Sequence, residues 1–188
     1  MKSGKTALVV IDVQRGFDDP YWGERNNPYF EQNIARLIDA FRQHKWPVIH
    51  VRHMSTSPHS PLRPGQSGNA FKPEAMPEVG EKIIEKTVNS AFIGTELEAY
   101  LKEQGIGALV LCGLTTDHCV STTTRMAGNL GFDTMLVSDA TATFGRAGID
   151  GHVFSADEIH QTALASLSGE FAWVMPLDQL LPLLQLIR

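Results

Sequence analysis

Short apolar runs and longer amphipathic stretches alternate along the chain, and this alternation restricts the fold more than any other feature. The run at 7–11 is apolar at every position, which is typical of a strand buried on both faces of a sheet. A later stretch instead carries Ile34, Leu37 and Phe41 at helical spacing. Strands that alternate with helices in this way predict a mostly parallel sheet covered by helices on both faces.

The pattern predicts a three-layer α/β fold, in the order α-β-α, around a six-stranded and mostly parallel sheet. The expected strands are 7–11, 47–51, 81–85, 108–112, 134–137 and 171–175. The expected helices are 29–44, 95–104, 117–129, 156–167 and 177–187. We expect Asn27 to cap the first helix, with Pro28 at its first position, and Gly105 to end the second helix.

Size and charge restrict the class of protein. A chain of 188 residues without a break in composition predicts a single domain that spans 1–188. The net charge of −5, without a dense Lys/Arg run, argues against a nucleic-acid partner or an anionic membrane. No apolar stretch approaches the length of a membrane span, and the first apolar run is too short for a signal peptide. We therefore expect a cytoplasmic protein.

Three segments lack a regular pattern: 13–27, 54–77 and 145–153. The second is rich in proline, and the third carries Gly145, Gly148 and Gly151 as possible hinges of a lid. Long irregular segments in a compact domain are usually functional or disordered. We expect such loops to shape a ligand site, because ligands bind at the carboxyl ends of the strands in open parallel sheets.

Polar side chains follow three of the expected strands at that edge. Asp12 follows the first strand, Lys86 the third, and Cys119 lies in the turn after the fourth. The turn leads into a helix whose N-terminus favours a thiolate, and its backbone N–H groups can hold an oxyanion. A carboxylate can take the thiol proton, and an ammonium can stabilise the thiolate. Cys112, in contrast, lies inside a strand, and we assign it to the core.

Three ordered motifs resemble those of the isochorismatase-like cysteine hydrolases, a family that includes nicotinamidases, N-carbamoylsarcosine amidohydrolases and isochorismatase. They are Val9-Val-Ile-Asp-Val-Gln-Arg-Gly-Phe17, Lys86-Thr-Val-Asn-Ser-Ala-Phe92 and Gly113-Leu-Thr-Thr-Asp-His-Cys119. The resemblance covers roughly residues 6 to 175, nearly the whole chain on the scale of a domain. It implies the six-stranded, Rossmann-like hydrolase fold of that family.

The resemblance also implies roles for individual residues. Asp12, Lys86 and Cys119 would form the catalytic triad. A cis peptide would join Leu114 to Thr115 and aim backbone N–H groups, those of Thr115 and Cys119, at the oxyanion. The resemblance further implies a homo-oligomer, a dimer or tetramer, and the apolar segment 180–187 would either supply the interface or form the last core helix.

The histidines do not reproduce the metal site of nicotinamidases in the family, which follows the second strand with an Asp-x-His pair and a further His. The corresponding run is His50-Val-Arg-His53, and no aspartate occurs between Asp39 and Asp117. We therefore expect no metal and no cofactor. We assign His50 and His53 to structural roles, and His118 and His160 to helix surface or packing.

Four residues are candidates for substrate binding: Gln14, Phe17, Trp22 and Phe92. Aromatic rings near the first motif suit a pocket wall that stacks on a planar substrate. Packing of the loop on the core explains the rings equally well, and Gln14 has an equal alternative in hydrogen bonds to loop backbone.

The motifs favour a metal-independent cysteine hydrolase that cleaves a C–N bond in a small amide, ureide or carbamoyl compound through a Cys119 acyl-enzyme. Two alternatives stay open. One is an isochorismatase-type vinyl ether hydrolase that uses Asp12 as its acid. The other is a non-catalytic binding module on the same fold.

Overall fold

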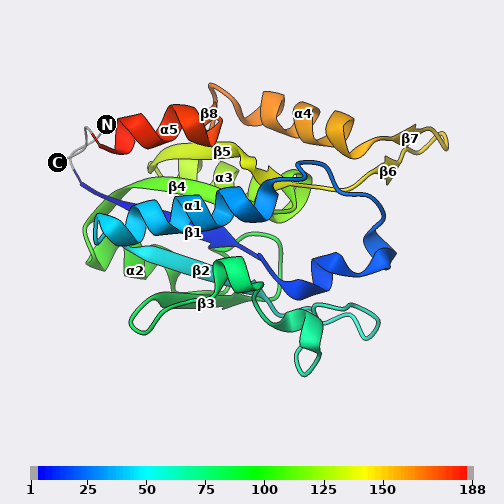
Figure 1. The fold of residues 1–188 in the computed structure, drawn as a ribbon, viewed down its shortest axis with the longest axis horizontal. Coiled ribbons are helices and arrows are strands. Elements are labelled where there is room, and N and C mark those ends of the chain that lie inside the picture. Colours follow the sequence, from blue (N-terminus) through cyan, green and yellow to red (C-terminus); the bar gives the residue numbers. More distant parts are fainter. Residues whose placement is uncertain (1–3, 186–188) are drawn as a thin grey trace.

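The computed structural model describes residues 4–185, and its centre is one six-stranded parallel sheet (Figure 1). The strand order is β3-β2-β1-β4-β5-β8, and every neighbouring pair is parallel. The strands are β1 (Lys5–Ile11), β2 (Val48–His53), β3 (Lys82–Lys86), β4 (Ile106–Leu114), β5 (Asp133–Ala142) and β8 (Trp173–Met175). The α/β class and the parallel sheet predicted from the sequence are thus confirmed.

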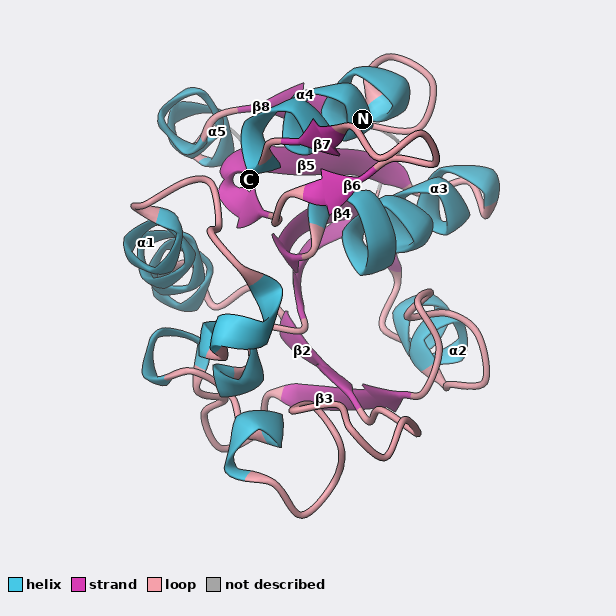
Figure 2. Cartoon of the chain, turned by 90° about the vertical axis from the view of Figure 1, so that its right-hand side faces the viewer, coloured by secondary structure: helices cyan, strands magenta, loops and turns pink. Residues whose placement is uncertain are grey.

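Helices cover both faces of this sheet (Figure 2). They are α1 (Phe30–Gln43), α2 (Leu97–Glu103), α3 (Ser121–Asn129), α4 (Ala156–Leu167) and α5 (Leu177–Leu184). The apolar sides of α1 and α5 pack in one core cluster, and those of α2 and α4 pack in a second cluster on the opposite face. Gly105, with a positive φ of 66°, follows α2 as predicted.

The chain reverses its winding between β1 and β4, the two central strands of the sheet. Ile11 at the end of β1 pairs with Gly113 near the end of β4. Gly113 has a φ of 124°, and a Cβ at this position would lie 2.0 Å from the carbonyl oxygen of Ile11. Only glycine permits this close approach, which brings the residues after β1 next to the turn after β4.

The first helix begins later than predicted, and Asn27 is not its cap. The N-cap is Tyr29, so α1 starts at Phe30 and Pro28 lies before it. Asn27 has a φ of 51°, and its side-chain amide donates to the carbonyl oxygens of Ser138 at 3.0 Å and Thr141 at 2.5 Å. The side chain therefore joins the entry loop to the end of β5 instead of capping a helix.

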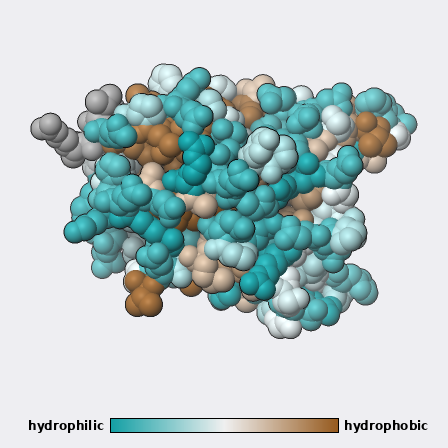
Figure 3. Space-filling view, viewed as in Figure 1, coloured by the Kyte–Doolittle hydropathy of each residue, from teal (hydrophilic) through white to brown (hydrophobic). Residues whose placement is uncertain are grey.

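The segment 145–153 is more regular than predicted. Strands β6 (Arg146–Ala147) and β7 (Val153–Phe154) pair antiparallel and form a hairpin that projects from the body of the fold (Figure 1). Its exposed apolar side chains include Ile149 and Val153, and hydrophobic colour marks this projection in Figure 3. Gly145 thus directly precedes a paired hairpin, and Gly151 lies in its loop with a φ of 85°.

Other expected elements differ in their bounds. Strands β2, β4 and β5 run further than predicted, β8 begins two residues later, and a π-helical turn, η5 (Thr116–Val120), precedes α3. Helix α5 ends at Leu184, and the predicted end at residue 187 lies outside the described residues. Within 4–185, no helix combines the length and the apolar character that crossing a bilayer requires.

Candidate active site

Asp12, Lys86 and Cys119 lie together at the carboxyl end of the sheet. Asp12 is the first residue after β1, Lys86 is the last residue of β3, and Cys119 lies in η5. Lys86 Nζ donates to Asp12 Oδ2 at 2.6 Å and to Cys119 Sγ at 3.2 Å. The structure therefore brings the three residues of the expected triad into direct contact through the ammonium.

Burial makes this contact chemically unusual. The side chains of Asp12 and Lys86 have no exposed surface, and Cys119 is 9% exposed. A fully buried ion pair loses about as much hydration energy as it gains in attraction, so it adds little to stability. A buried carboxylate, ammonium and thiol in one cluster is instead typical of a site that carries out chemistry.

The thiol of Cys119 is protonated in the resting protein. Burial raises its pKa to about 12, the Asp12 charge adds to this effect, and the Lys86 charge opposes it. Lys86 therefore lowers the pKa of the thiol, as expected, but desolvation and the carboxylate outweigh one ammonium. Asp12 Oδ1 is buried and has no hydrogen-bond partner among residues 4–185. This oxygen is free to accept the thiol proton.

The turn that carries Cys119 is held by backbone and side-chain bonds. A cis peptide joins Leu114 to Thr115. The Thr115 carbonyl oxygen then accepts hydrogen bonds from the N–H groups of His118 at 3.1 Å and Val120 at 3.2 Å. These two bonds fold the chain back sharply at the start of η5, which places Cys119 opposite the end of β1.

Side chains from distant segments support the same turn. The Thr116 hydroxyl lies 2.7 Å from Nδ1 of His160, a buried residue of α4. Asp117 accepts from the Thr143 hydroxyl at 2.5 Å and from Arg146 Nε at 2.7 Å. The assignment of His160 to packing agrees with its burial, but the sequence did not indicate its contact with the nucleophile turn.

His53 is a member of the cluster that sequence reasoning missed. Its Nδ1 lies 3.1 Å from Lys86 Nζ, because β2 extends two residues beyond the predicted end and places His53 beside Lys86 in register. Burial, and then the Lys86 charge, lowers the pKa of His53, so the ring is neutral. Asn89 was also missed, although it lies within the lysine motif; its Oδ1 is 3.8 Å from Cys119 Sγ.

Gln14 is fully engaged with backbone groups. Its Nε2 donates to the carbonyl oxygens of His53 at 3.1 Å and Asn69 at 2.9 Å, and its Oε1 accepts from the His53 N–H at 2.8 Å. The side chain has no exposed surface. The geometry therefore favours the structural alternative for Gln14, which fixes His53, over contact with a substrate.

The remaining candidates for substrate binding lie on two sides of the cluster. Phe17 and Trp22 stack with Phe144 in one aromatic group, with ring centroids 5.0 to 6.1 Å apart. Trp22 also lines a cavity of about 270 Å³ together with His53. Phe92 lies on the opposite side of the sheet, where it stacks on Phe132 in the core cluster that contains Cys119.

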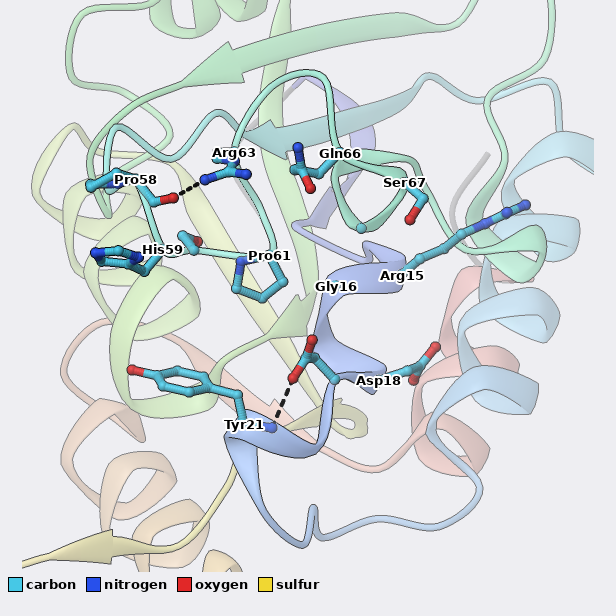
Figure 4. A pocket seen from close by; sticks show the side chains of 13 residues that line it. Arg15, Gly16, Asp18, Tyr21, Pro58, His59, Pro61, Arg63, Gln66 and Ser67 are labelled. Carbon is cyan, nitrogen blue, oxygen red and sulfur yellow. Dashed lines mark hydrogen bonds between the residues drawn. The ribbon is translucent and has the colours of Figure 1, made fainter.

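A second cavity, of about 730 Å³, lies further from the cluster (Figure 4). The segments 15–21 and 58–68 form its walls, and its polar groups include Arg15, His59 and Arg63. The two cavities share the segment from His59 to Pro61. Asp12, Lys86 and Cys119 line neither cavity, but His53, which contacts Lys86, lines the 270 Å³ cavity and not the larger one. The 270 Å³ cavity is therefore the better candidate for a substrate pocket.

The two histidines of β2 have different partners. His50 Nε2 is bonded to Glu81 Oε2 at 2.9 Å, and Glu81 is bonded in turn to Arg42. This arrangement engages the ring of His50 in the core. Within the described part of the chain, one group of three ligand-type side chains lies within 4.8 Å: Asp12, His53 and Cys119, all of which contact Lys86.

Known proteins match this chain over almost its full length. The model of the isochorismatase domain family matches residues 6–179. The isochorismatase family protein YrdC of Bacillus subtilis (strain 168) is 51% identical over 94% of this chain and 95% of its own. Nicotinamidase 3 of Arabidopsis thaliana is 29% identical over 93% of this chain and 86% of its own.

A solved structure gives the same result. An isochorismatase-family protein of Chromobacterium violaceum ATCC 12472 superposes with a TM-score of 0.95 at 47% identity, and the match covers 100% of this chain and 97% of the other. The parallel sheet agrees with this match. The chain belongs to the isochorismatase-like hydrolase family.

Proposed function

We propose that this protein is a cysteine hydrolase that cleaves a C–N bond in a small amide, ureide or carbamoyl compound. One observation carries the proposal: the buried Lys86 ammonium is bonded to both Asp12 Oδ2 and Cys119 Sγ. A nucleophile, a proton acceptor and a cation in contact are the groups that acyl transfer requires. The name of the relative Nicotinamidase 3 agrees with this class of reaction.

The first half of the reaction begins with the neutral thiol. As Sγ of Cys119 attacks the carbonyl carbon, Asp12 Oδ1 takes the thiol proton, and the carbonyl oxygen becomes an oxyanion. Backbone N–H groups of Thr115 and Cys119 would donate to that oxygen. The tetrahedral intermediate collapses when Asp12 passes the same proton to the nitrogen. The C–N bond then breaks, the amine or ammonia leaves, and a thioester to Cys119 remains.

The second half restores the enzyme. Asp12 takes a proton from a water molecule, whose oxygen attacks the thioester carbon. The C–S bond breaks, the Cys119 sulfur regains a proton, and the carboxylic or carbamic acid leaves. Lys86 exchanges no proton in either half of this scheme. Its charge stabilises the sulfur as it becomes an anion, and its bond to Oδ2 holds the carboxylate in the orientation that both proton transfers need.

The proposed substrate is small and partly planar. The cavity of about 270 Å³ beside His53 suits a molecule of modest size, and Trp22 supplies an aromatic wall. Tyr21 and three serines, Ser55, Ser57 and Ser60, add hydrogen-bonding groups to the lining. We therefore place the reacting carbonyl at Cys119 and the rest of the substrate toward Trp22.

The test is a screen of small amides, ureides and carbamoyl compounds with wild-type protein, followed by Cys119→Ala and Asp12→Asn. We expect each variant to lose about 10⁴-fold in kcat/KM, because nucleophile and base act as one unit. Cys112→Ala is the matched control, because this cysteine lies inside β4 away from the cluster, and it should retain wild-type turnover.

Three outcomes would contradict the proposal. Full turnover of an amide by Cys119→Ala would exclude the acyl-enzyme. Hydrolysis of isochorismate that survives in Cys119→Ser but not in Asp12→Asn would instead support the vinyl ether reaction, in which Asp12 is the acid. Saturable binding of a compound, without turnover by wild-type protein, would favour the non-catalytic module.

A further inference from the structure

The Lys86 ammonium is surrounded by donor atoms that also suit a transition metal. Its Nζ lies 2.6 Å from Asp12 Oδ2, 3.1 Å from His53 Nδ1 and 3.2 Å from Cys119 Sγ. One sulfur, one imidazole nitrogen and one carboxylate oxygen form a ligand set that Zn²⁺ accepts well. Three protein ligands leave the fourth tetrahedral position open.

The distances are close to those of a metal site. The three donor atoms lie within 4.8 Å of one another. Bonds to Zn²⁺ of about 2.0 to 2.3 Å put ligand atoms roughly 3.3 to 3.7 Å apart, so shifts of about 1 Å bring them to bonding distance. Asp12 Oδ1 is buried without a partner among the described residues, which makes a second oxygen available.

The histidine is held in place independently of the ammonium. Gln14 bonds both the N–H and the carbonyl oxygen of His53, so the backbone of this residue is fixed whether or not Lys86 is present. His53 also lines the 270 Å³ cavity, so one of the three ligand residues borders a space that an ion can enter. A preorganised ligand lowers the cost of binding.

We propose that Asp12, His53 and Cys119 form a reversible inhibitory site for one thiophilic divalent cation, such as Zn²⁺, which displaces the Lys86 ammonium. When the metal–sulfur bond forms, Cys119 loses its thiol proton to solvent. Asp12 and neutral His53 supply lone pairs, and no oxidation state changes. The bound metal engages the lone pair with which the Cys119 sulfur would attack a carbonyl carbon. The protein is therefore inactive until a chelator removes the ion.

The test uses Co²⁺ as a spectroscopic probe of the purified full chain. A thiolate bound to Co²⁺ gives a charge-transfer band in the near ultraviolet, and we expect this band to saturate at one equivalent. Lys86→Ala should bind about tenfold tighter or more, because the competing ammonium is gone. Cys119→Ser should give no charge-transfer band, and Cys112→Ser should give the wild-type band. His53→Asn should weaken binding at least about tenfold.

The readout does not require a substrate, so it stands apart from the proposed hydrolase activity. Wild-type protein that gives no band, even at a large excess of Co²⁺, overturns the proposal, and this arm needs no variant to fold. A band that persists in Cys119→Ser also overturns it, because the sulfur would then belong to another residue. Displacement of Co²⁺ by Zn²⁺, and recovery with a chelator, would complete the support.

Discussion

Two buried lysines, Lys72 and Lys86, show how the same side chain can serve structure in one region and chemistry in another. They are 4% and 1% exposed, and each contacts a carboxylate. Lys72 Nζ is bonded to Asp18 and to Glu31, the latter at 2.8 Å. Lys86 has a single carboxylate partner, and its other contacts are an imidazole and a thiol.

The two lysines differ in whether their hydrogen-bond partners keep groups that can still accept or donate a proton. Glu31 is also bonded to Arg25, at 2.5 and 2.7 Å, so the Lys72 region is a closed network of paired charges that joins the loop 13–27 to α1. The Lys86 region keeps a free carboxylate oxygen and a protonated thiol. A buried ammonium with two carboxylates is saturated, whereas one with a carboxylate and a thiol retains groups that can exchange a proton.

The largest expected effect is on catalysis, in which the two lysines should differ most. Lys86→Ala should lower kcat/KM for the best screened substrate by about 10³-fold, because the developing sulfur anion loses its cation. Lys72→Ala should keep turnover within about tenfold of wild type, since Lys72 contacts no member of the cluster. Equal losses in the two variants would show that the distinction between the regions is wrong.

Lys86→Ala should also destabilise the protein more than Lys72→Ala does. Lys86→Ala leaves Asp12 buried and without a counter-charge, which costs about 3 to 5 kcal/mol of unfolding free energy. Lys72→Ala should cost about 1 to 2 kcal/mol, because Glu31 keeps Arg25 and Asp18 is 62% exposed. Urea unfolding measures both. The double variant Lys86→Ala with Asp12→Ala should recover part of the loss, and a further additive loss would contradict this account.

The stability that the Lys72 network contributes should decrease at acid pH. Burial alone would raise the pKa of Glu31, but its bonds to Arg25 and Lys72 lower the pKa from 4.5 to about 2. A carboxyl with a lowered folded-state pKa adds stability above pH 4.5, and this contribution falls away between about pH 4.5 and 2. Glu31→Gln should therefore flatten the acid limb of stability by about 2 kcal/mol.

The control for that pH profile is a second carboxylate. Bonds to Arg42, together with the Glu78 N–H, hold the pKa of Glu81 at about 2 against the opposing effect of its burial, and Glu81 lies outside the Lys72 network. Glu31→Gln protein should thus still lose stability in acid through Glu81. If the profile of Glu31→Gln matched that of wild type, the Lys72 network would contribute nothing to acid stability.

The smallest expected effect concerns Cys112, which, unlike Cys119, has no lysine beside it. Burial raises the pKa of Cys112 far above its ordinary value, and no charged group contributes. Cys112→Ala should cost about 1 kcal/mol and leave turnover unchanged, since it removes only packed sulfur. Iodoacetamide followed by intact mass should modify wild-type protein once, at Cys119. Modification of Cys112 at a similar rate would mean that β4 opens readily.

The sequence was most informative for the strands, which have a recognisable apolar pattern, and for the residues that directly follow them. Runs such as 7–11 are apolar throughout because both faces of the sheet are covered, so the strands could be recognised one by one. Parallel strands put their carboxyl ends at one edge, and this rule alone placed Asp12 and Lys86 together. The same rule placed Cys119 there, in the turn between the fourth expected strand and the helix that follows it.

The parts that sequence reasoning missed depend on contacts between distant segments. Asn27 has the local features of a helix cap, but carbonyl groups more than 100 residues away bind its side chain. Gln14 and His53 are 39 residues apart and meet only because β2 lies beside β1. Lys72 lies in a loop without a regular pattern, where nothing local distinguishes a buried ammonium from a solvated one.

Gly113 limits how this protein can vary. With the carbonyl of Ile11 only 2.0 Å from the place of a Cβ, even alanine would have to push β1 and β4 apart. Asp12 follows β1, and the turn that carries Cys119 follows β4. A side chain at position 113 would therefore also increase the distance between the Asp12 carboxylate and the Cys119 thiol. A library randomised at this position should therefore yield glycine alone among active clones, while neighbouring apolar positions in β4 tolerate several residues. The clearance between two backbones, rather than the chemistry of a side chain, thus determines which residue position 113 accepts.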